Sequence, residues 1–226
     1  MQDGNGLAVR PDAGPDEDRI AGSREKGLNR VLHILEFLHA NQRAIGIGDL
    51  YGMDYVRGND LLRRGRQEVD NLSRETGETS ELCMLQNGRY TIVHSSPGTR
   101  PFRISSATGL QIPLPWTASG RLLLAGFERA VIEDMVSEDD LVLPDGRRLL
   151  LDDFIEDIAT AGAAGYCVTS GLVDAYTKCL AAPVFSAAGK VEATICLVVP
   201  IDTSEEKTGD LIALLRERAA RLSITG

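Results

Sequence analysis

The sequence predicts an α+β protein, with a mostly helical N-terminal third followed by a larger domain in which an antiparallel sheet is flanked by helices. Apolar residues recur at helical spacing between residues 23 and 76. From residue 80 onward, short strand-like runs are separated by turn residues. Helical segments lie between groups of these strands and after the last of them, an order that indicates an α+β domain.

The composition is that of a globular chain. The 226 residues are 43% hydrophobic and 25% charged, which is enough for one substantial core and an appendage. No apolar run approaches the roughly 20 residues that a membrane span needs, and the N-terminus lacks the apolar stretch of a signal peptide. We therefore expect a cytoplasmic protein without membrane contact.

The net charge of -9 is unevenly distributed. Residues 1–66 have 10 basic and 10 acidic side chains, whereas residues 67–226 have 14 and 23. Without the acidic tail to Asp18, residues 19–66 have 9 basic and 5 acidic side chains, a local +4. This surplus is compatible with a surface that faces phosphates.

The N-terminal third is expected to contain a tail and helices. Residues 1–22 are rich in Gly, Pro and Asp and bury too little apolar surface to fold. A helix is predicted from a cap at Ser23 to about Asn41, and residues 42–50 indicate a turn and the opening of a second helix. A long linking helix over 59–76 is predicted to end at Gly77.

The remaining elements are strands and helices in alternation. A hairpin is expected over 80–96, because its two strand-like runs flank an Asn-Gly turn. Two prolines then keep the backbone extended before a helix that begins at Thr117 or Ala118, and the last helix is expected to start with Thr203 and a capping box to Glu206. The other predicted elements are strands over 102–106, 165–170, 179–185 and 191–199 and a helix over 150–162.

Motifs of enzymes and metal sites are not evident in the sequence. Ser23 and Lys26 have the SxxK spacing without its companion motifs, and no histidine has a partner at catalytic spacing. We interpret His33, His39 and His94 as surface or packing residues and expect no catalytic residue. Cofactors are not expected either. The four cysteines have no CxxC spacing and no nearby histidine, so we expect reduced, buried thiols and no metal site at Cys83, Cys167, Cys179 and Cys196.

The predicted helix at Thr117 has two interpretations. Its first turn, Thr117, Ala118, Ser119 and Gly120, could present free backbone N–H groups and the positive end of the helix dipole to a carboxylate. Alternatively, Thr117 caps the helix and the small residues permit close packing. Without further information both interpretations stay open.

Three segments together resemble a known family. IPLPWTASGRLLLA at 112–125, GY at 165–166 and CLAAPVF at 179–185 resemble the effector-binding domain of IclR (isocitrate lyase regulator) transcription regulators. LNRVLHILEFLHANQRAIGIGDL at 28–50 is similar to the opening of that family's winged helix-turn-helix, and SRETGET at 73–79 to the start of its sensor domain.

The resemblance implies a DNA-binding transcription regulator with a GAF-like effector-binding domain. Its partners would be operator DNA, a small organic acid and a second copy of the chain, as a dimer or a dimer of dimers. Trp116 and Tyr176 add aromatic surface, which favours a bulkier or aromatic acid. The effector-binding residues expected from the resemblance and the helix start are Ile112, Trp116, Thr117, Ala118, Ser119, Gly120, Thr169, Tyr176, Thr177, Cys179, Cys196 and Val198.

The departure from the family pattern that matters most lies at Leu50. In the family, about 30 residues of recognition helix and β-wing precede the linker helix, whereas here Leu50 is followed directly by Tyr51. Either the protein contains residues that this sequence lacks, or it lacks a complete DNA-reading unit. A ligand-binding and dimerisation protein without DNA activity is therefore the alternative function.

The expected organisation follows from these interpretations. We expect a tail over 1–22, a partial winged helix-turn-helix over 23–58, the linker helix over 59–76 and the effector-binding domain over 77–226. Candidate DNA contacts are Arg24, Lys26, Arg30 and Arg57. Phosphates could also be contacted by Arg63, Arg64 and Arg66, but a solvated helix face explains these three and Arg57 better.

Overall fold

The computed structural model describes residues 47–86, 88–100 and 108–223, with side chains from residue 60 onward. Residues 57–226 form one compact unit. The expected tail, the helix from Ser23, the strand over 102–106 and the candidate DNA contacts Arg24, Lys26 and Arg30 lie outside the described residues, as does the side chain of Arg57. Among the helices of the described part, none is long and apolar enough to cross a membrane.

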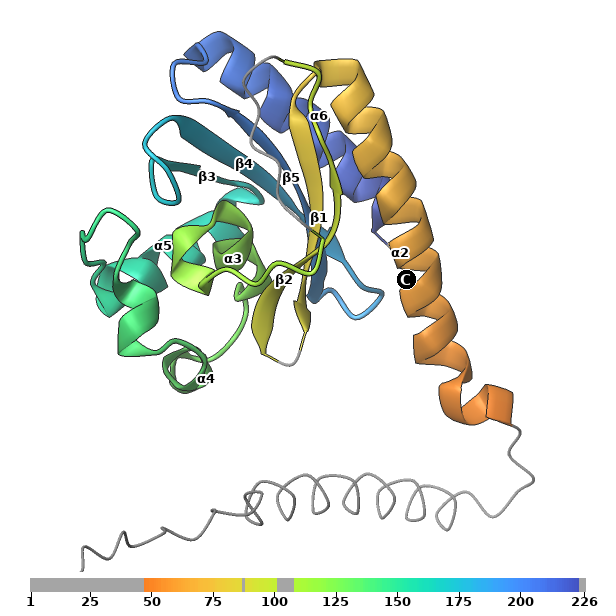
Figure 1. The fold of residues 1–226 in the computed structure, drawn as a ribbon. Coiled ribbons are helices and arrows are strands. Elements are labelled where there is room, and N and C mark those ends of the chain that lie inside the picture. The colour runs from red at the N-terminus through yellow and green to blue at the C-terminus, as the bar shows by residue number, and fades with distance from the viewer. Residues whose placement is uncertain (1–46, 87, 101–107, 224–226) are drawn as a thin grey trace, which may run out of the picture. The chain divides into compact units, whose positions relative to one another are not determined.

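A five-stranded antiparallel sheet forms the centre of the described unit (Figure 1). The strand order is β2-β1-β5-β4-β3, so the last strand in the chain lies at the middle of the sheet. The predicted α+β class and the hairpin after residue 79 are confirmed. The strands are β1 (Thr79–Gln86), β2 (Arg89–Ser96), β3 (Cys167–Ser170), β4 (Thr177–Phe185) and β5 (Val191–Pro200).

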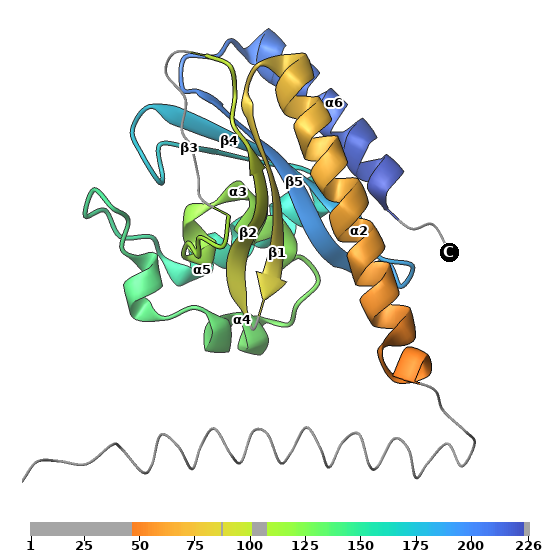
Figure 2. The same ribbon diagram turned by 45° about the vertical axis from the view of Figure 1, so that its right-hand side comes forward.

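Helices cover both faces of the sheet, as Figure 2 shows. Because successive strand residues point to opposite faces, Ile195 and Cys196 belong to two different cores. Ile195 packs with apolar residues of α2 and α6, and Cys196 packs with those of α3 and α5. These helices are α2 (Ile47–Thr76), α3 (Ala118–Leu123), α5 (Leu151–Ala164) and α6 (Glu205–Leu222).

Helix α2 is longer than the predicted linker helix. It ends where the sequence predicted, because Gly77 adopts a φ of 74° and its N–H donates to the carbonyl of Ser73. Its beginning lies 12 residues earlier than predicted, at Ile47. Leu50 and Tyr51 are therefore consecutive residues of one helix, and no wing lies between residues 47 and 76.

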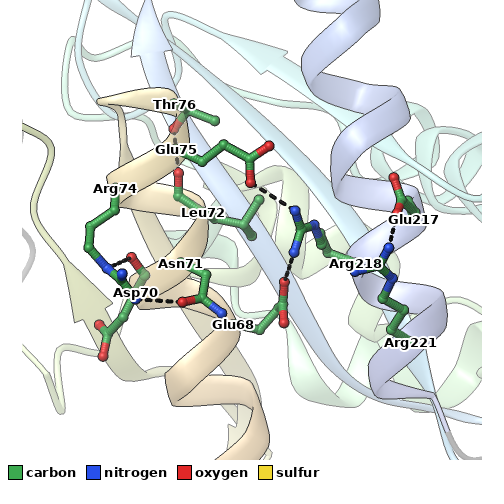
Figure 3. Close-up of polar contacts among 10 residues, drawn as sticks. All are labelled: Glu68, Asp70, Asn71, Leu72, Arg74, Glu75, Thr76, Glu217, Arg218 and Arg221. Carbon is green, nitrogen blue, oxygen red and sulfur yellow. Dashed lines mark hydrogen bonds and ion pairs between the residues drawn. The ribbon is translucent and has the colours of Figure 1, made fainter.

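An arginine of α6 joins α2 to the sheet unit (Figure 3). Arg218 donates from Nη1 to Glu68 Oε1 and from Nη2 to Glu75 Oε2, both at 2.8 Å. Arg218 and Glu68 are each less than one-fifth exposed, so the pair is only partly screened by water. Beside it, Leu72 packs with α6 and the sheet at 0% exposure.

Three features differ from the sequence predictions. The last helix begins one residue later than expected: Ser204 is its cap, with Oγ accepting from the Lys207 N–H, while the Thr203 N–H donates to the Pro200 carbonyl. Two short elements were not predicted, because neither has enough turns to show a period: α4 (Arg129–Met135) and the 3-10 helix η2 (Glu138–Leu141). A further 3-10 helix, η1 (Leu114–Trp116), immediately precedes α3.

Candidate effector-binding site

The start of α3 is a capped and tightly packed helix end. Thr117 is its N-cap, and its Oγ1 accepts a hydrogen bond of 2.8 Å from the Gly120 N–H. A side chain at Gly120 would meet the Leu114 carbonyl oxygen at 2.1 Å, so glycine alone fits. The capping and packing interpretation therefore explains Thr117 and Gly120, and one of the N–H groups expected to receive a carboxylate is already bonded.

A cavity lies between this helix start, the sheet and the turn that connects β3 to β4. It encloses about 490 Å³ of space, counted out to its open mouth. Seven residues expected from the sequence line it: Ile112, Trp116, Thr117, Thr169, Thr177, Cys179 and Val198. Those on β3, β4 and β5 belong to one face of the sheet, because Thr169 pairs with Cys179 and Cys179 pairs with Val198.

Five expected residues do not line the cavity. Ala118, Ser119 and Cys196 are 0% exposed and lie in the core, and Gly120 is buried against Leu114. Tyr176 is instead 79% exposed. Tyr176 lies in the turn before β4, so its direction is set by that turn and not by the strand.

The turn between β3 and β4 is fixed by Asp174. Its Oδ1 accepts from the Tyr176 N–H at 2.8 Å, and its Oδ2 accepts from Thr177 Oγ1 at 2.7 Å. These bonds hold the turn against the cavity and leave the Tyr176 side chain outside it. The aromatic surface of the cavity therefore comes from Trp116 and Tyr90.

Six lining residues were not predicted. Glu81 and Tyr90 come from the hairpin, and four residues form the turn after β3: Gly171, Leu172, Val173 and Asp174. No sequence pattern marked Glu81, because its place at the cavity depends on the pairing of β1 with β5. The turn was not marked either, since its contacts depend on how β3 and β4 pair.

The cavity lining is acidic rather than basic. Glu81 and Asp174 line it, and no lysine or arginine does among the residues that the structure describes. Arg121 is close to the site in the sequence, but its side chain is buried and does not line the cavity. It donates to Asp157 Oδ2 at 3.0 Å and to the carbonyls of Pro115 and Thr117, so it anchors the segment before α3.

One arginine lies beside the rim. Arg147 donates from Nη2 to the carbonyl of Gly171 at 2.6 Å, and its side chain is 58% exposed. It therefore has N–H donors free to meet solvent next to the turn that borders the cavity. Trp116, which lines the cavity, donates from Nε1 to the Asp140 carbonyl at 2.7 Å, and this bond fixes the plane of the indole.

Thiols cluster beneath the cavity. The Sγ of Cys83 lies 3.0 Å from Tyr90 Oη, and the Sγ of Cys196 lies 3.6 Å from Glu81 Oε2. Hydrogen bonds with the thiols of Cys179 and Cys83, together with burial, raise the pKa of Cys196 well above its ordinary value. Burial likewise raises the pKa of Tyr90, so its hydroxyl stays protonated at neutral pH.

Comparison with known proteins identifies the family. Residues 53–224 match the family described as "Bacterial transcriptional regulator IclR C-terminal". The chain belongs to the IclR family. The match covers the sheet, the cavity and most of α2, and it confirms the resemblance drawn from the sequence.

Curated relatives of the chain are transcriptional regulators. The HTH-type transcriptional regulator KdgR of Dickeya chrysanthemi is 25% identical over 174 residues, covering 76% of this chain and 57% of the relative. KipR of Bacillus subtilis is 25% identical over 139 residues, covering 61% of this chain and 56% of the relative. The chain thus spans little more than half the length of these relatives.

Solved structures share the fold. The C-terminal domain of E. coli KdgR is 26% identical, with a TM-score of 0.62 over 73% of this chain and 96% of that chain. An IclR homolog from Microbacterium hydrocarbonoxydans, crystallised with 4-hydroxybenzoate, has a TM-score of 0.61 at 21% identity, covering 73% of this chain and 67% of that chain. The fold is therefore that of IclR effector domains.

Proposed function

We propose that this protein is a DNA-binding transcription regulator whose C-terminal domain responds to a small molecule held in the cavity between α3 and the β3–β4 turn. The cavity carries the proposal, because its residues come from all five strands and two connecting segments of one compact unit. A ligand there contacts both the sheet and the turn, so it can favour one arrangement of the domain over another.

The lining favours a ligand with a hydrogen-bond donor at its inner end. Glu81 is 4% exposed and presents a carboxylate, so a hydroxyl or amine of the ligand would pair with it. Ile112, Trp116 and Val198 provide apolar surface for a ring or short chain.

A carboxylate on the ligand would have to point outward. At the inner end it would meet the Glu81 side chain, whereas Arg147 lies beside the rim. We therefore propose a small hydroxylated aromatic acid, donor inward and carboxylate outward. The 4-hydroxybenzoate found with the Microbacterium hydrocarbonoxydans homolog has both groups and supports this chemical class.

A thermal-shift series tests the ligand class. 4-Hydroxybenzoate should raise the unfolding temperature more than benzoate, and acetate should have no effect, since a ligand at 100 times its Kd stabilises the folded state by about 2.7 kcal/mol. Val198→Phe fills the cavity and should remove the shift, while Val131→Phe on α4, outside the cavity, should retain it. Equal shifts for benzoate and 4-hydroxybenzoate would refute the inward donor.

Helix α2 is the proposed link between the cavity domain and the N-terminal segment. Arg218 ties it to α6, and Leu72 ties it to the core beneath β5. We propose that the regulator acts as a homodimer or a dimer of dimers, in which ligand binding changes how paired N-terminal segments meet operator DNA. Light scattering on the purified chain would measure its oligomeric state with and without ligand.

A ligand-binding protein without DNA activity is the second candidate. It is favoured by the continuous helix from Ile47 to Thr76, which leaves no wing in that part of the chain. Under the main proposal, phosphate contacts come from Arg24, Lys26, Arg30 and Arg57. The two candidates differ in one measurable property, which is binding to operator DNA.

A further inference from the structure

Three potential metal ligands meet on one face of two neighbouring strands. Glu81 of β1 pairs directly with Cys196 of β5, and Cys83 lies two residues further along β1. Residues two apart in a strand point to the same face, so Glu81 and Cys83 project beside Cys196. The side chains are far apart in the sequence, at 81, 83 and 196, and only strand pairing brings them together.

Their ligand atoms have the spacing of a metal site. The carboxylate oxygen of Glu81 and the sulfurs of Cys83 and Cys196 all lie within 4.8 Å of one another. Tetrahedral zinc, with bonds of about 2.3 Å to sulfur and 2.0 Å to oxygen, places a sulfur and an oxygen about 3.5 Å apart. The Cys196 Sγ to Glu81 Oε2 distance is already 3.6 Å. Small side-chain rotations are enough to complete the geometry.

We propose that Glu81, Cys83 and Cys196 form a binding site for a zinc ion. Two thiolates and one carboxylate suit zinc better than magnesium or calcium, which prefer oxygen ligands throughout. Three protein ligands leave a fourth position, which a water molecule fills. Glu81 also lines the cavity, so a dissolved ion can reach the site from there.

One neighbouring side chain suits the bound form. Tyr90 Oη lies 3.0 Å from Cys83 Sγ, where its hydroxyl can donate to a metal-bound thiolate. A disulfide between the two cysteines does not fit as well. Cys83 pairs with Thr194 rather than with Cys196, so the two are diagonal neighbours at about 7–8 Å, beyond the span of an unstrained disulfide.

Cys167 provides a matched control for the two cysteine ligands. Cys167 is also free and buried, and it lies on β3, away from the three ligands. The same substitution at Cys167 and at Cys196 therefore separates metal binding from the general loss of a buried thiol. Glu81→Gln keeps the shape of the third ligand and removes its charge, so it tests the site even if a cysteine variant folds poorly.

The experiment is a cobalt titration of the full chain, reduced and freed of metal by chelation. Co²⁺ should produce a thiolate-to-cobalt charge-transfer band that saturates at one ion per chain, and Zn²⁺ should abolish it. Cys83→Ala, Cys196→Ala and Glu81→Gln should each weaken Co²⁺ binding by at least about tenfold, and Cys167→Ala should bind like the unmodified protein. Absence of the band, or equal loss in Cys167→Ala, would overturn the proposal. Neither effector nor DNA is needed, so the titration can fail while the proposed function stands, although both proposals use Glu81.

Discussion

Replacing Gly120 by alanine should destabilise the protein, although alanine is the better helix former. The added Cβ would lie 2.1 Å from the Leu114 carbonyl oxygen and 2.9 Å from Thr117 Oγ1. A carbon and an oxygen normally approach to about 3.3 Å, so the backbone of η1 must move by roughly 1 Å. Overpacking of this kind costs about 1–3 kcal/mol, and the higher helix propensity of alanine offsets about 1 kcal/mol. We expect a net loss of about 1 kcal/mol, and of about 2 kcal/mol at the upper end of the overpacking cost.

Gly209 on α6 provides the opposite case. It is also helical, but a Cβ there would meet no atom within 4 Å. Gly209→Ala should therefore stabilise the protein by about 0.5–1 kcal/mol. Urea unfolding of both variants, followed by circular dichroism, measures the two changes at a constant m-value. If Gly120→Ala were as stable as the unmodified protein, the close approach of α3 to Leu114 would be refuted.

Three further perturbations follow from the geometry. Arg218→Met should lower the free energy of unfolding by about 1–3 kcal/mol, because it leaves two α2 carboxylates without their partner. The control Arg221→Met removes an exposed ion pair and should change the free energy of unfolding by less than about 0.5 kcal/mol. Equal effects of the two substitutions would contradict the anchoring role of Arg218. Burial raises the pKa of Cys167 from 9.0 to about 12, so the folded state holds this proton more tightly and stability should fall as pH rises from about 9 towards 12. Stability of Cys167→Ala should fall less over that window, and parallel pH profiles would argue against the shift. Trp116→Phe removes the hydrogen bond to the Asp140 carbonyl and should lower the free energy of unfolding by about 0.5–1.5 kcal/mol in the same urea assay. An unchanged free energy of unfolding would show that this hydrogen bond is absent.

The sequence predicted the elements whose patterns are local. The hairpin, the start of α3 and the end of α2 at Gly77 were each marked by neighbouring residues, namely an Asn-Gly turn, a capping threonine and a glycine with positive φ. Helix α4 and the start of α2 were not predicted correctly. The first is too short to show a period, and the second lies in a segment whose glycines interrupt the apolar pattern.

The cavity was predicted only in part, because local sequence patterns mark some of its residues and strand pairing brings in the others. Residues adjacent to a recognisable motif, such as Trp116 and Thr177, do line it, although their role in binding stays a prediction. Tyr176 was placed in the cavity by its neighbours in the sequence, but the turn held by Asp174 leaves its side chain exposed. The grouping of Glu81, Cys83 and Cys196 could not be read from spacing, because it depends on the register between β1 and β5.

Binding of DNA by the ligand-responsive chain is the most direct test of the proposed function. Fluorescence anisotropy of a labelled duplex from upstream of the protein's own gene, measured over a stated salt series, gives both affinity and salt dependence. The main proposal predicts binding whose log affinity falls linearly with log salt, and at least a roughly fivefold change in Kd when the ligand that stabilises the cavity is present. If the full chain, with the ligand bound, does not bind DNA at any salt concentration, the main proposal is contradicted. The second candidate, a ligand-binding protein without DNA activity, then remains.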